Sequence, residues 1–350
     1  MKIYRILVAL VVLSLPLFGQ ETKDAAPKGG ATSIFTVSDG STLRKAEWSF
    51  ADYLPQDKTL DSKLMGRNMP YQVVLPSGYT KSSDEDIKFP VIYLLHGLTG
   101  HFNNWTDKTK VIEYAEKYRV ILVFPEGGDG WYTDSVSNEK EKYESYIIKE
   151  LIPEIEKNYR VDKRREARAI AGLSMGGYGS LKFGLKYPDM FVIAGSFSGA
   201  LGAAEITEKN FPGSIGKSID AIFGPADSDT RRANDIFDIV RKTTPEKIKT
   251  LPYFYIDCGT EDFLFQTNRD FISLLTEKKI PHEYRQLPGT HNWQYWDSQV
   301  KEFFRVASQK LSNGKELACA DNPAHFCGGG ETTLGRPISI EEIKALPPRP

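Results

Sequence analysis

Residues 169–178 read AIAGLSMGGY, and this stretch decides the fold. It contains the pattern G-x-S-x-G, in which Ser174 stands between Gly172 and Gly176. An apolar run precedes the serine, and residues 178–187 have the pattern of a helix that ends before a proline. A strand, a sharp turn and a helix in this order would place the Ser174 hydroxyl above a sheet, in front of a helix N-terminus. The stretch therefore predicts a nucleophilic serine rather than an idle one in a glycine-rich turn.

Apolar runs and helical patterns alternate along the chain. Strands are expected at 70–75, 90–95, 120–124, 167–173, 191–197, 252–258 and 282–287, and helices at 144–159, 178–187, 265–279 and 293–311. This alternation predicts an α/β fold, with a mostly parallel central sheet and helices on both faces. Pro153 predicts an irregularity inside its helix. Residues 199–251 have no clear strand and are expected to form an excursion that shapes the substrate pocket.

The chain has 350 residues, is 40% apolar and carries a formal net charge of −1. These values favour one large domain and disfavour a nucleic-acid groove or a polybasic membrane patch. We expect a catalytic domain at 41–311, between a disordered polar linker at 21–40 and an irregular tail at 312–350.

The first twenty residues have the layout of a secretory signal peptide. Lys2 and Arg5 precede the apolar residues 6–18, which are short for a membrane span. We therefore predict a signal peptide at 1–20, a secreted or periplasmic protein, and no stable membrane insertion after cleavage. A retained N-terminal anchor is the alternative.

The cysteines do not suggest a metal site. Cys319 and Cys327 lie close together in the tail and either bridge in an oxidising compartment or remain free thiols. Cys258 ends an apolar strand and is expected to be a buried packing residue. Because there is no C-x-x-C pair or His/Cys cluster, we expect neither metal nor cofactor.

A serine nucleophile needs a general base, and the base needs an acid that fixes its tautomer. His291 lies in a loop that enters a helix after the last expected strand, where a base is expected. His282 falls inside that strand and His325 lies in the tail, so both are weaker candidates.

Three carboxylates in residues 257–263 (DCGTEDF) could be the acid. Asp257 lies within a strand, whereas Glu261 and Asp262 come just after its end. We predict Asp262 as the acid, with Glu261 as the second candidate.

The developing oxyanion needs two hydrogen-bond donors. One is the backbone N–H of Met175, directly after the nucleophile. The second is expected from the loop His-Gly-Leu-Thr-Gly that follows the strand at 90–95, and the N–H of Leu98 is the candidate. His96 is expected to brace this loop.

With these motifs, the chain resembles the esterase D family of α/β-hydrolases over residues 69–304. Five pieces carry the resemblance, in the family's order: Leu95–Gly100, Gly130–Ser135 (GWYTDS), Gly172–Ser180 (GLSMGGYGS), Cys258–Leu264 (CGTEDFL) and Gly289–Trp296 (GTHNWQYW). The resemblance implies the α/β-hydrolase fold. It also implies a triad of Ser174, Asp262 and His291 and oxyanion donors at Leu98 and Met175.

The family includes feruloyl and acetyl-xylan esterases, S-formylglutathione hydrolases and secreted mycolyltransferases. S-formylglutathione hydrolases are typically cytosolic and carry a cysteine just after the oxyanion loop, where this chain has Gly100 and His101. Mycolyltransferases typically use Glu as the acid, a role that Glu261 would fill here. The resemblance therefore favours the carbohydrate esterases.

Aromatic residues gather near the motifs, and such rings suit sugars or a phenolic acyl group. We predict Trp105, Trp131, Tyr132 and Trp293 as substrate-binding residues, although each of the tryptophans could equally belong to the core. Trp296 is expected in the core.

Together these features predict an exported serine carboxylesterase with a Ser-His-Asp acyl-enzyme mechanism. The expected substrate is a carbohydrate-linked ester, feruloyl or acetyl. The alternatives are an acyltransferase of mycolyltransferase type on the same serine, an S-formylglutathione hydrolase-like thioesterase, and a non-catalytic secreted binding protein.

Overall fold

The computed structural model of the chain describes residues 54–76, 79 and 87–311. The predicted signal peptide (1–20), the linker (21–40), the tail (312–350) and its Cys319 and Cys327 lie outside the described residues.

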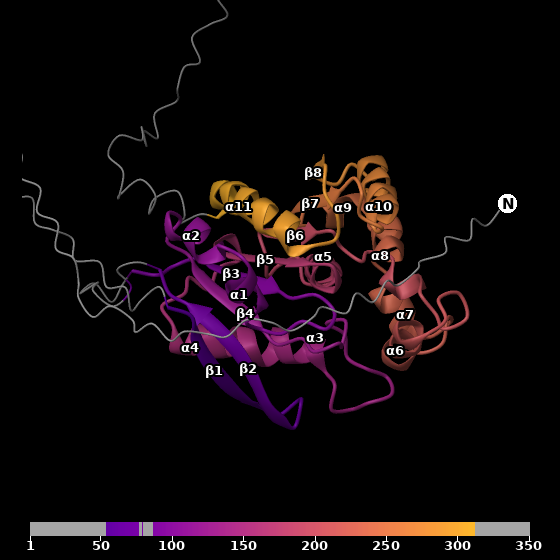
Figure 1. The fold of residues 1–350 in the computed structure, drawn as a ribbon, viewed down its shortest axis with the longest axis horizontal. Coiled ribbons are helices and arrows are strands. Elements are labelled where there is room, and N and C mark those ends of the chain that lie inside the picture. Colours follow the sequence, from indigo (N-terminus) through magenta and orange to yellow (C-terminus); the bar gives the residue numbers. More distant parts are fainter. Residues whose placement is uncertain (1–53, 77–78, 80–86, 312–350) are drawn as a thin grey trace, which may run out of the picture. The chain divides into compact units, whose positions relative to one another are not determined.

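An eight-stranded sheet runs through the described part of the chain (Figure 1). The strands are β1 (Gln56–Ser62), β2 (Arg67–Val74), β3 (Val91–Leu95), β4 (Ile121–Pro125), β5 (Arg168–Leu173), β6 (Ile193–Phe197), β7 (Tyr253–Gly259) and β8 (His282–Leu287). Their order is β1-β2-β4-β3-β5-β6-β7-β8. Strand β2 pairs antiparallel with both β1 and β4, and all other neighbours are parallel. The prediction of a mostly parallel sheet is confirmed.

The central strands are buried on both faces. In β3 (VIYLL), Val91, Tyr93 and Leu95 belong to one apolar cluster, whereas Ile92 and Leu94 belong to another. A continuous apolar run is typical of a parallel strand that is covered on both sides, because alternate side chains point to opposite faces.

Helices cover both faces, as predicted (Figure 1). On one face lie α1 (Asn104–Lys108), α2 (Val111–Glu116) and α11 (Trp293–Lys310). On the other face lie α3 (Tyr143–Tyr146), the π-helix η2 (Ile147–Leu151), α4 (Ile152–Asn158), α5 (Met175–Lys186) and α10 (Phe265–Glu277). A short 3-10 turn, η3 (Arg165–Ala167), precedes β5. The four predicted helices and seven predicted strands all occur, with shifts at their ends.

Two elements differ from the expectation for physical reasons. Strand β1 (QDKTLDS) was missed because it is a polar edge strand, and antiparallel pairing with β2 defines it rather than an apolar pattern. The helix expected at 144–159 is interrupted by η2, directly before Pro153 at the start of α4. Proline lacks the N–H that would continue the α-helical ladder, so the predicted irregularity is confirmed.

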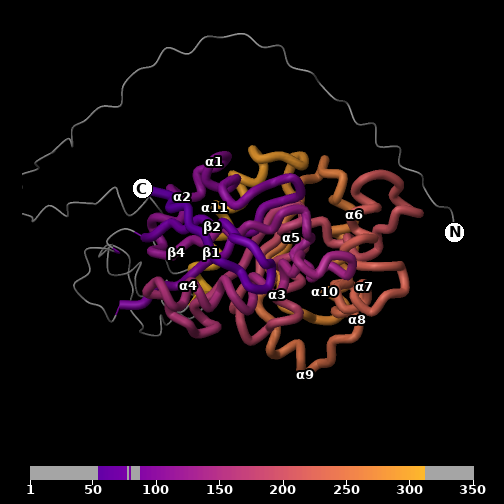
Figure 2. The backbone as a smooth tube through the Cα atoms, turned by 90° about the horizontal axis from the view of Figure 1, so that it is seen from below, coloured from indigo at the N-terminus to yellow at the C-terminus, as the bar shows by residue number. Residues whose placement is uncertain are grey.

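The segment between β6 and β7 contains no strand, as predicted. It consists of η4 (Ala203–Glu205), α6 (Ser214–Phe223), α7 (Asp229–Asn234), α8 (Ile236–Lys242) and α9 (Pro245–Ile248). We call this segment, residues 199–252, the insertion. Helix α8 packs against α10 and α7, and α7 packs against α6. Figure 2 shows α6 to α9 away from β1.

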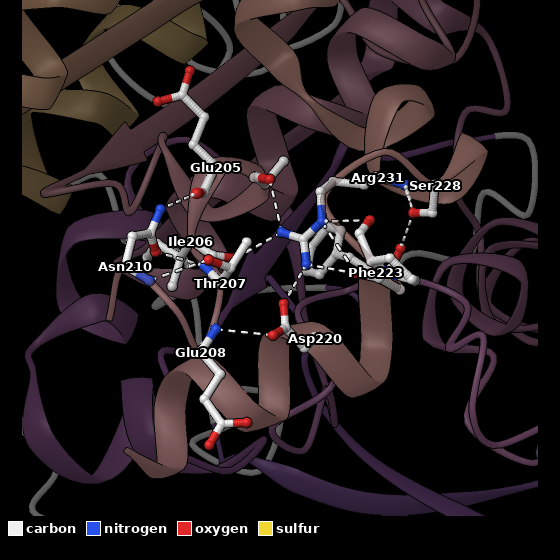
Figure 3. A network of polar contacts seen from close by, with 12 residues as sticks. Glu205, Ile206, Thr207, Glu208, Asn210, Asp220, Phe223, Ser228 and Arg231 are labelled. Carbon is white, nitrogen blue, oxygen red and sulfur yellow. Dashed lines mark hydrogen bonds and ion pairs between the residues drawn. The ribbon is translucent and has the colours of Figure 1, made fainter. Parts of the chain in front are cut away.

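Arg231 joins the parts of the insertion (Figure 3). Its buried guanidinium donates to the carbonyl oxygens of Ala204 (2.9 Å) and Ile206 (2.6 Å). It also donates to the carbonyl oxygen of Gly224 (2.6 Å) and to Oδ1 of Asp220 (2.7 Å). We call Arg231 and these four partners the Arg231 hub. The hub connects η4, α6 and α7 through one side chain, and thereby stabilises a segment that has no sheet to hold it.

Candidate active site

Ser174 lies at a strained turn between β5 and α5. Its backbone has φ 53° and ψ −116°, a conformation that costs a non-glycine residue about 1–3 kcal/mol. The glycines on either side permit this turn. A Cβ on Gly172 would lie 2.4 Å from the carbonyl oxygen of Gly176, and one on Gly176 would lie 2.6 Å from the carbonyl oxygen of His96. A hydrogen bond to the neighbouring strand β6 holds the turn: Ser174 N–H donates to the Phe197 carbonyl oxygen at 2.9 Å.

His291 and Asp262 come to Ser174 from the loops after β8 and β7. Nε2 of His291 lies 3.0 Å from Ser174 Oγ, and its Nδ1 lies 2.8 Å from Asp262 Oδ2. The Asp262 side chain is 0% exposed and that of His291 is 18% exposed. An ionised carboxylate can only accept, so Nδ1 carries the proton and Nε2 is left to accept from the serine hydroxyl. The structure thus brings the three predicted triad residues together in one hydrogen-bonded chain.

The two adjacent carboxylates of the acid loop have different partners. The Asp262 carboxylate faces His291, and its Oδ1 accepts a 2.9 Å bond from Leu264 N–H. The exposed Glu261 carboxylate instead accepts from Gly289 N–H, which lowers the pKa of Glu261. Glu261 therefore fastens the acid loop to the loop that carries the base, while Asp262 contacts the base itself.

Asp257, the third carboxylate of the sequence motif, is buried inside β7. Burial raises the pKa of Asp257 well above its ordinary value, and the hydroxyls of Tyr255 and Tyr295 lie next to it. A carboxyl group that stays protonated cannot balance an imidazolium by its charge. This agrees with the choice of a carboxylate beyond the strand end.

The predicted oxyanion loop lies against the nucleophile. A Cβ on Gly97 would lie 3.4 Å from Cβ of Ser174, so the backbone of this loop approaches the serine closely. Gly100 N–H bonds to the Gly97 carbonyl oxygen (3.1 Å), which closes a turn around Leu98. Within residues 54–76, 79 and 87–311, the N–H groups of Leu98 and Met175 have no acceptor. Both remain free to donate to an oxyanion.

His96 braces this loop, as predicted. Its Nδ1 lies 2.7 Å from the Gly97 carbonyl oxygen, and its Nε2 accepts a 2.8 Å bond from Gly127 N–H. The Tyr132 hydroxyl donates to the His96 carbonyl oxygen (2.9 Å). Both ring nitrogens are therefore engaged in holding backbone, and His96 is buried away from solvent.

Comparisons with known proteins agree with this geometry. The esterase family model, described as "Putative esterase", matches residues 62–305. The chain belongs to this esterase family. An acetyl esterase of Caldicellulosiruptor saccharolyticus is 31% identical over 258 residues, which are 71% of this chain and 96% of that protein. A mycolyltransferase, Ag85B of Mycobacterium avium, is 25% identical over 244 residues, 60% of this chain and 72% of that protein.

Solved structures show the same fold. A ferulic acid esterase matches with a TM-score of 0.64 and 28% identity, over 74% of this chain and 98% of that one. This esterase thus has the α/β-hydrolase fold that the sequence predicted, and it is a carboxylic ester hydrolase rather than a non-catalytic binding protein.

Three of the four aromatic residues predicted to bind substrate lie in the core of the esterase. Trp105 and Tyr132 are 0% exposed and Trp131 is 4% exposed. Trp105 donates from Nε1 to the Leu95 carbonyl oxygen (3.0 Å), so it holds the end of β3. The prediction is wrong for these three, because their rings pack between the sheet and its helices and present no face to a ligand.

Trp293 is partly exposed, and its substrate role stays a prediction. Its ring meets Trp105 (5.7 Å between centroids) and Trp296 (5.3 Å) edge to face, and Nζ of Lys108 lies 5.1 Å from its centroid. Trp296 is buried, as predicted, and packs edge to face on His291 at 4.9 Å. Trp296 thus supports the base directly, and Trp293 packs behind Trp296.

The sequence reasoning missed Phe263, which directly follows the acid. Its side chain is exposed, and its ring centroid lies 4.6 Å from that of His291. The sequence feature that could have identified Phe263 is a large apolar residue in the polar loop that also carries the predicted acid.

A cavity of about 220 Å³ lies between the loop after β4 and α6, and no triad residue lines it. Asp129 connects it to the oxyanion loop, because Asp129 Oδ1 accepts a 2.6 Å bond from Thr99 N–H. The lining is mostly polar and consists of Asp129, Gly130, Ser135, Ser137, Glu141, Tyr143, Ser218, Ala221 and Ile222. The described residues contain no group of three or more His, Cys, Asp or Glu suited to a metal ion. They also contain no helix long and apolar enough to cross a membrane.

Proposed function

We propose that this esterase hydrolyses carbohydrate-linked esters, acetyl or feruloyl, through an acyl-enzyme on Ser174. The observation that carries the proposal is the hydrogen-bonded chain from Ser174 Oγ through His291 to Asp262, at 3.0 Å and 2.8 Å. A serine hydroxyl is a weak nucleophile at neutral pH, and this arrangement of base and acid is what activates it.

The reaction follows from the positions of the groups. Ser174 Oγ attacks the ester carbonyl carbon while its proton passes to His291 Nε2. The N–H groups of Leu98 and Met175 donate to the carbonyl oxygen as it becomes negative. Asp262 stabilises the imidazolium, which then gives its proton to the departing alcohol oxygen. Water repeats the sequence on the acyl-enzyme, releases the acid and restores the serine.

Two observations support a carbohydrate-linked substrate. Proteins similar to this chain are named an acetyl esterase and a ferulic acid esterase. The polar cavity beside Asp129 offers carboxylates and hydroxyls, which are groups that bind sugar hydroxyls.

We also propose that the protein is exported. The support is Lys2 and Arg5 before the apolar residues 6–18. We expect the mature protein in the periplasm or the medium, with a new N-terminus near residue 20. Cell fractionation with N-terminal sequencing tests this, and an uncleaved chain in the cytosol would contradict it.

An acyltransferase on the same serine is the second candidate, favoured by the similarity to Ag85B. In that reaction a sugar hydroxyl replaces water in the attack on the acyl-enzyme. The two activities are separated by supplying an ester with a labelled acyl group and measuring its partition between water and an added sugar.

The test of the mechanism is Ser174→Ala. We expect ester hydrolysis to fall by several orders of magnitude and covalent labelling by a fluorophosphonate to disappear, because both need Oγ. The variant should stay folded, since the hydroxyl is at the surface of the site. A folded variant that keeps more than about a tenth of the activity would contradict the assignment.

A further inference from the structure

Among the described residues, Phe263 is the most exposed large apolar residue. Its side chain is 72% exposed, although phenylalanine is usually buried. Single exposed apolar residues are common and need no function. Phe263 is different because its ring packs on His291, at 4.6 Å between centroids and 47° between ring planes. Phe263 therefore contacts the residue whose Nε2 lies 3.0 Å from the Ser174 hydroxyl oxygen.

Two aromatic side chains contact the His291 ring, and one is buried while the other is exposed. Trp296 meets the ring at 4.9 Å and 89° and is itself buried, so it supports the imidazole from the interior. Phe263 meets the same ring at 4.6 Å and 47° and is itself exposed to solvent. Asp262 directly precedes Phe263. Its carboxylate accepts hydrogen bonds from His291 Nδ1–H and from Leu264 N–H, which fix the loop on both sides of Phe263. The aromatic face is therefore held in place beside the base rather than on a loose loop.

The chemistry of the step shows which part of a substrate reaches this face. His291 Nε2 delivers a proton to the departing alcohol oxygen, so the alcohol must lie next to the imidazole. The carbonyl oxygen lies instead toward the N–H groups of Leu98 and Met175. An exposed ring that packs on His291, 4.6 Å between centroids, is therefore close to the place from which the alcohol departs.

We propose that Phe263 forms an alcohol-side subsite that binds ring-shaped alcohols, such as a sugar or an aryl alcohol, through its flat apolar face. This inference rests on the proposed Ser174–His291 mechanism. The same face would hold an acceptor alcohol in acyl transfer. There the acceptor oxygen bonds to the acyl carbon and its proton passes to His291 Nε2, and then to Ser174 Oγ as the serine ester bond breaks.

The test compares acetate esters that differ only in the alcohol: ethyl acetate, phenyl acetate and a mono-acetylated methyl xyloside. All three give the same acetyl-enzyme, so the deacylation step is common to them. Dividing kcat/KM of Phe263→Ala by that of the wild type for each ester cancels the chemical reactivity of the ester. We expect a fall of about three- to tenfold for the two ring-shaped alcohols and less than about twofold for ethyl acetate.

Two further variants separate a binding face from a cover over the base. Phe263→Tyr keeps a flat ring and should retain the preference for ring-shaped alcohols, whereas Phe263→Leu keeps only apolar bulk and should lose it. Leu54→Ala, which removes another exposed apolar side chain (62% exposed) near the opposite edge of the sheet, is the matched control and should change none of the ratios. An equal fall for all three esters, or no fall for any, would overturn the proposal.

Labelling by a fluorophosphonate keeps this test distinct from that of the mechanism. The reagent releases fluoride and needs no alcohol subsite. If the wild type is not labelled at all, the role of Ser174 itself is refuted. Unchanged labelling in Phe263→Ala with altered alcohol preference would support the subsite alone, and slower labelling would show that Phe263 positions His291 instead.

Discussion

Ser174 directly precedes helix α5 and Lys182 lies in the middle of that helix, but their surroundings are opposite. Ser174 is partly exposed and strained, and its hydroxyl forms a hydrogen bond with His291. Lys182 is fully buried, and its ammonium donates to the Tyr132 carbonyl oxygen (2.6 Å), Thr133 Oγ1 (2.8 Å) and Glu144 Oε2 (2.8 Å). An ammonium group has three donors, and all three are satisfied here.

This difference separates two uses of polar groups. At the site, a reactive hydroxyl stays accessible, and the strain of its turn is borne by the packed strands around it. In the interior, a charge is tolerated only with complete hydrogen bonding and an ionic partner. Changes at the site should therefore reduce activity and leave the protein folded. Changes at the interior centres should reduce stability and leave the chemistry intact.

The largest effect is expected for Asp262→Asn. An amide in place of the carboxylate would leave the His291 imidazole in the wrong tautomer, so kcat should fall by about 10³–10⁴-fold at neutral pH. Thermal unfolding should change little by comparison. Steady-state kinetics and calorimetry on the purified variant measure both quantities.

Glu261→Gln is the matched control for that variant, because it changes the adjacent carboxylate in the same loop. Glu261 contacts Gly289 rather than His291, so its replacement should have a mild effect on kcat. The reverse ranking of the two variants would transfer the role of the acid to Glu261.

The sequence predicted those site residues whose positions follow from a short motif, and failed for those whose positions depend on distant segments of the chain. Ser174, His291 and Asp262 each stand in a short motif after an apolar strand, and parallel strands bring their ends to one edge of the sheet. Trp105 and Trp131 stand in similar motifs, yet their burial depends on segments far away in the chain, such as the contact of Trp105 with Trp293. A single sequence does not report such packing.

The same limit applies to the fold. The central strands are apolar on both faces and were predicted within a few residues, whereas the polar edge strand β1 was not. The pairing of Lys182 with Glu144 could not be read from the sequence either, because it depends on how α3 packs against α5.

A second test concerns the Arg231 hub, which is an interior centre outside the core sheet. Arg231→Met would remove the Arg231 donor from the carbonyl oxygens of Ala204 and Ile206 and from Oδ1 of Asp220. We expect a loss of about 3–5 kcal/mol in the free energy of unfolding, measured by urea denaturation, with kcat on a small ester nearly unchanged.

Arg232→Met is the control for the hub, since Arg232 is the next residue and is half-exposed beside Asp229. An exposed ion pair contributes about 0–1 kcal/mol, so this variant should unfold at nearly the wild-type urea concentration. Equal losses of unfolding free energy in the two variants would show that the hub does not stabilise the fold more than an exposed ion pair does. A large fall in kcat for Arg231→Met would show that the insertion contributes to catalysis.

The smallest effect concerns the pH dependence of the Lys182–Glu144 pair. Burial acts to raise the pKa of Glu144, but the ammonium groups of Lys182 and Lys186 outweigh it and lower the value from 4.5 to about 2. A depressed carboxyl pKa contributes stability that is complete above the unfolded value and is lost as pH falls through the folded one. The pair should thus stabilise the fold fully above about pH 4.5 and lose that contribution toward pH 2.

Glu144→Gln tests this sign directly. At pH 7 the variant should unfold with about 3 kcal/mol less free energy than the wild type, from roughly 1.36 kcal/mol per pKa unit. This difference in unfolding free energy should narrow as the pH is lowered from 4.5 toward 2. The Glu144 carboxyl of the wild type then becomes protonated, so that residue 144 is uncharged in both proteins. Urea denaturation at pH 7 and at several acidic values measures it, and Glu166→Gln, at an exposed position, should show little difference at any of them. A difference that stays constant or grows on acidification would mean that Glu144 is not held ionised by Lys182, and the contrast between the two parts of α5 would fail.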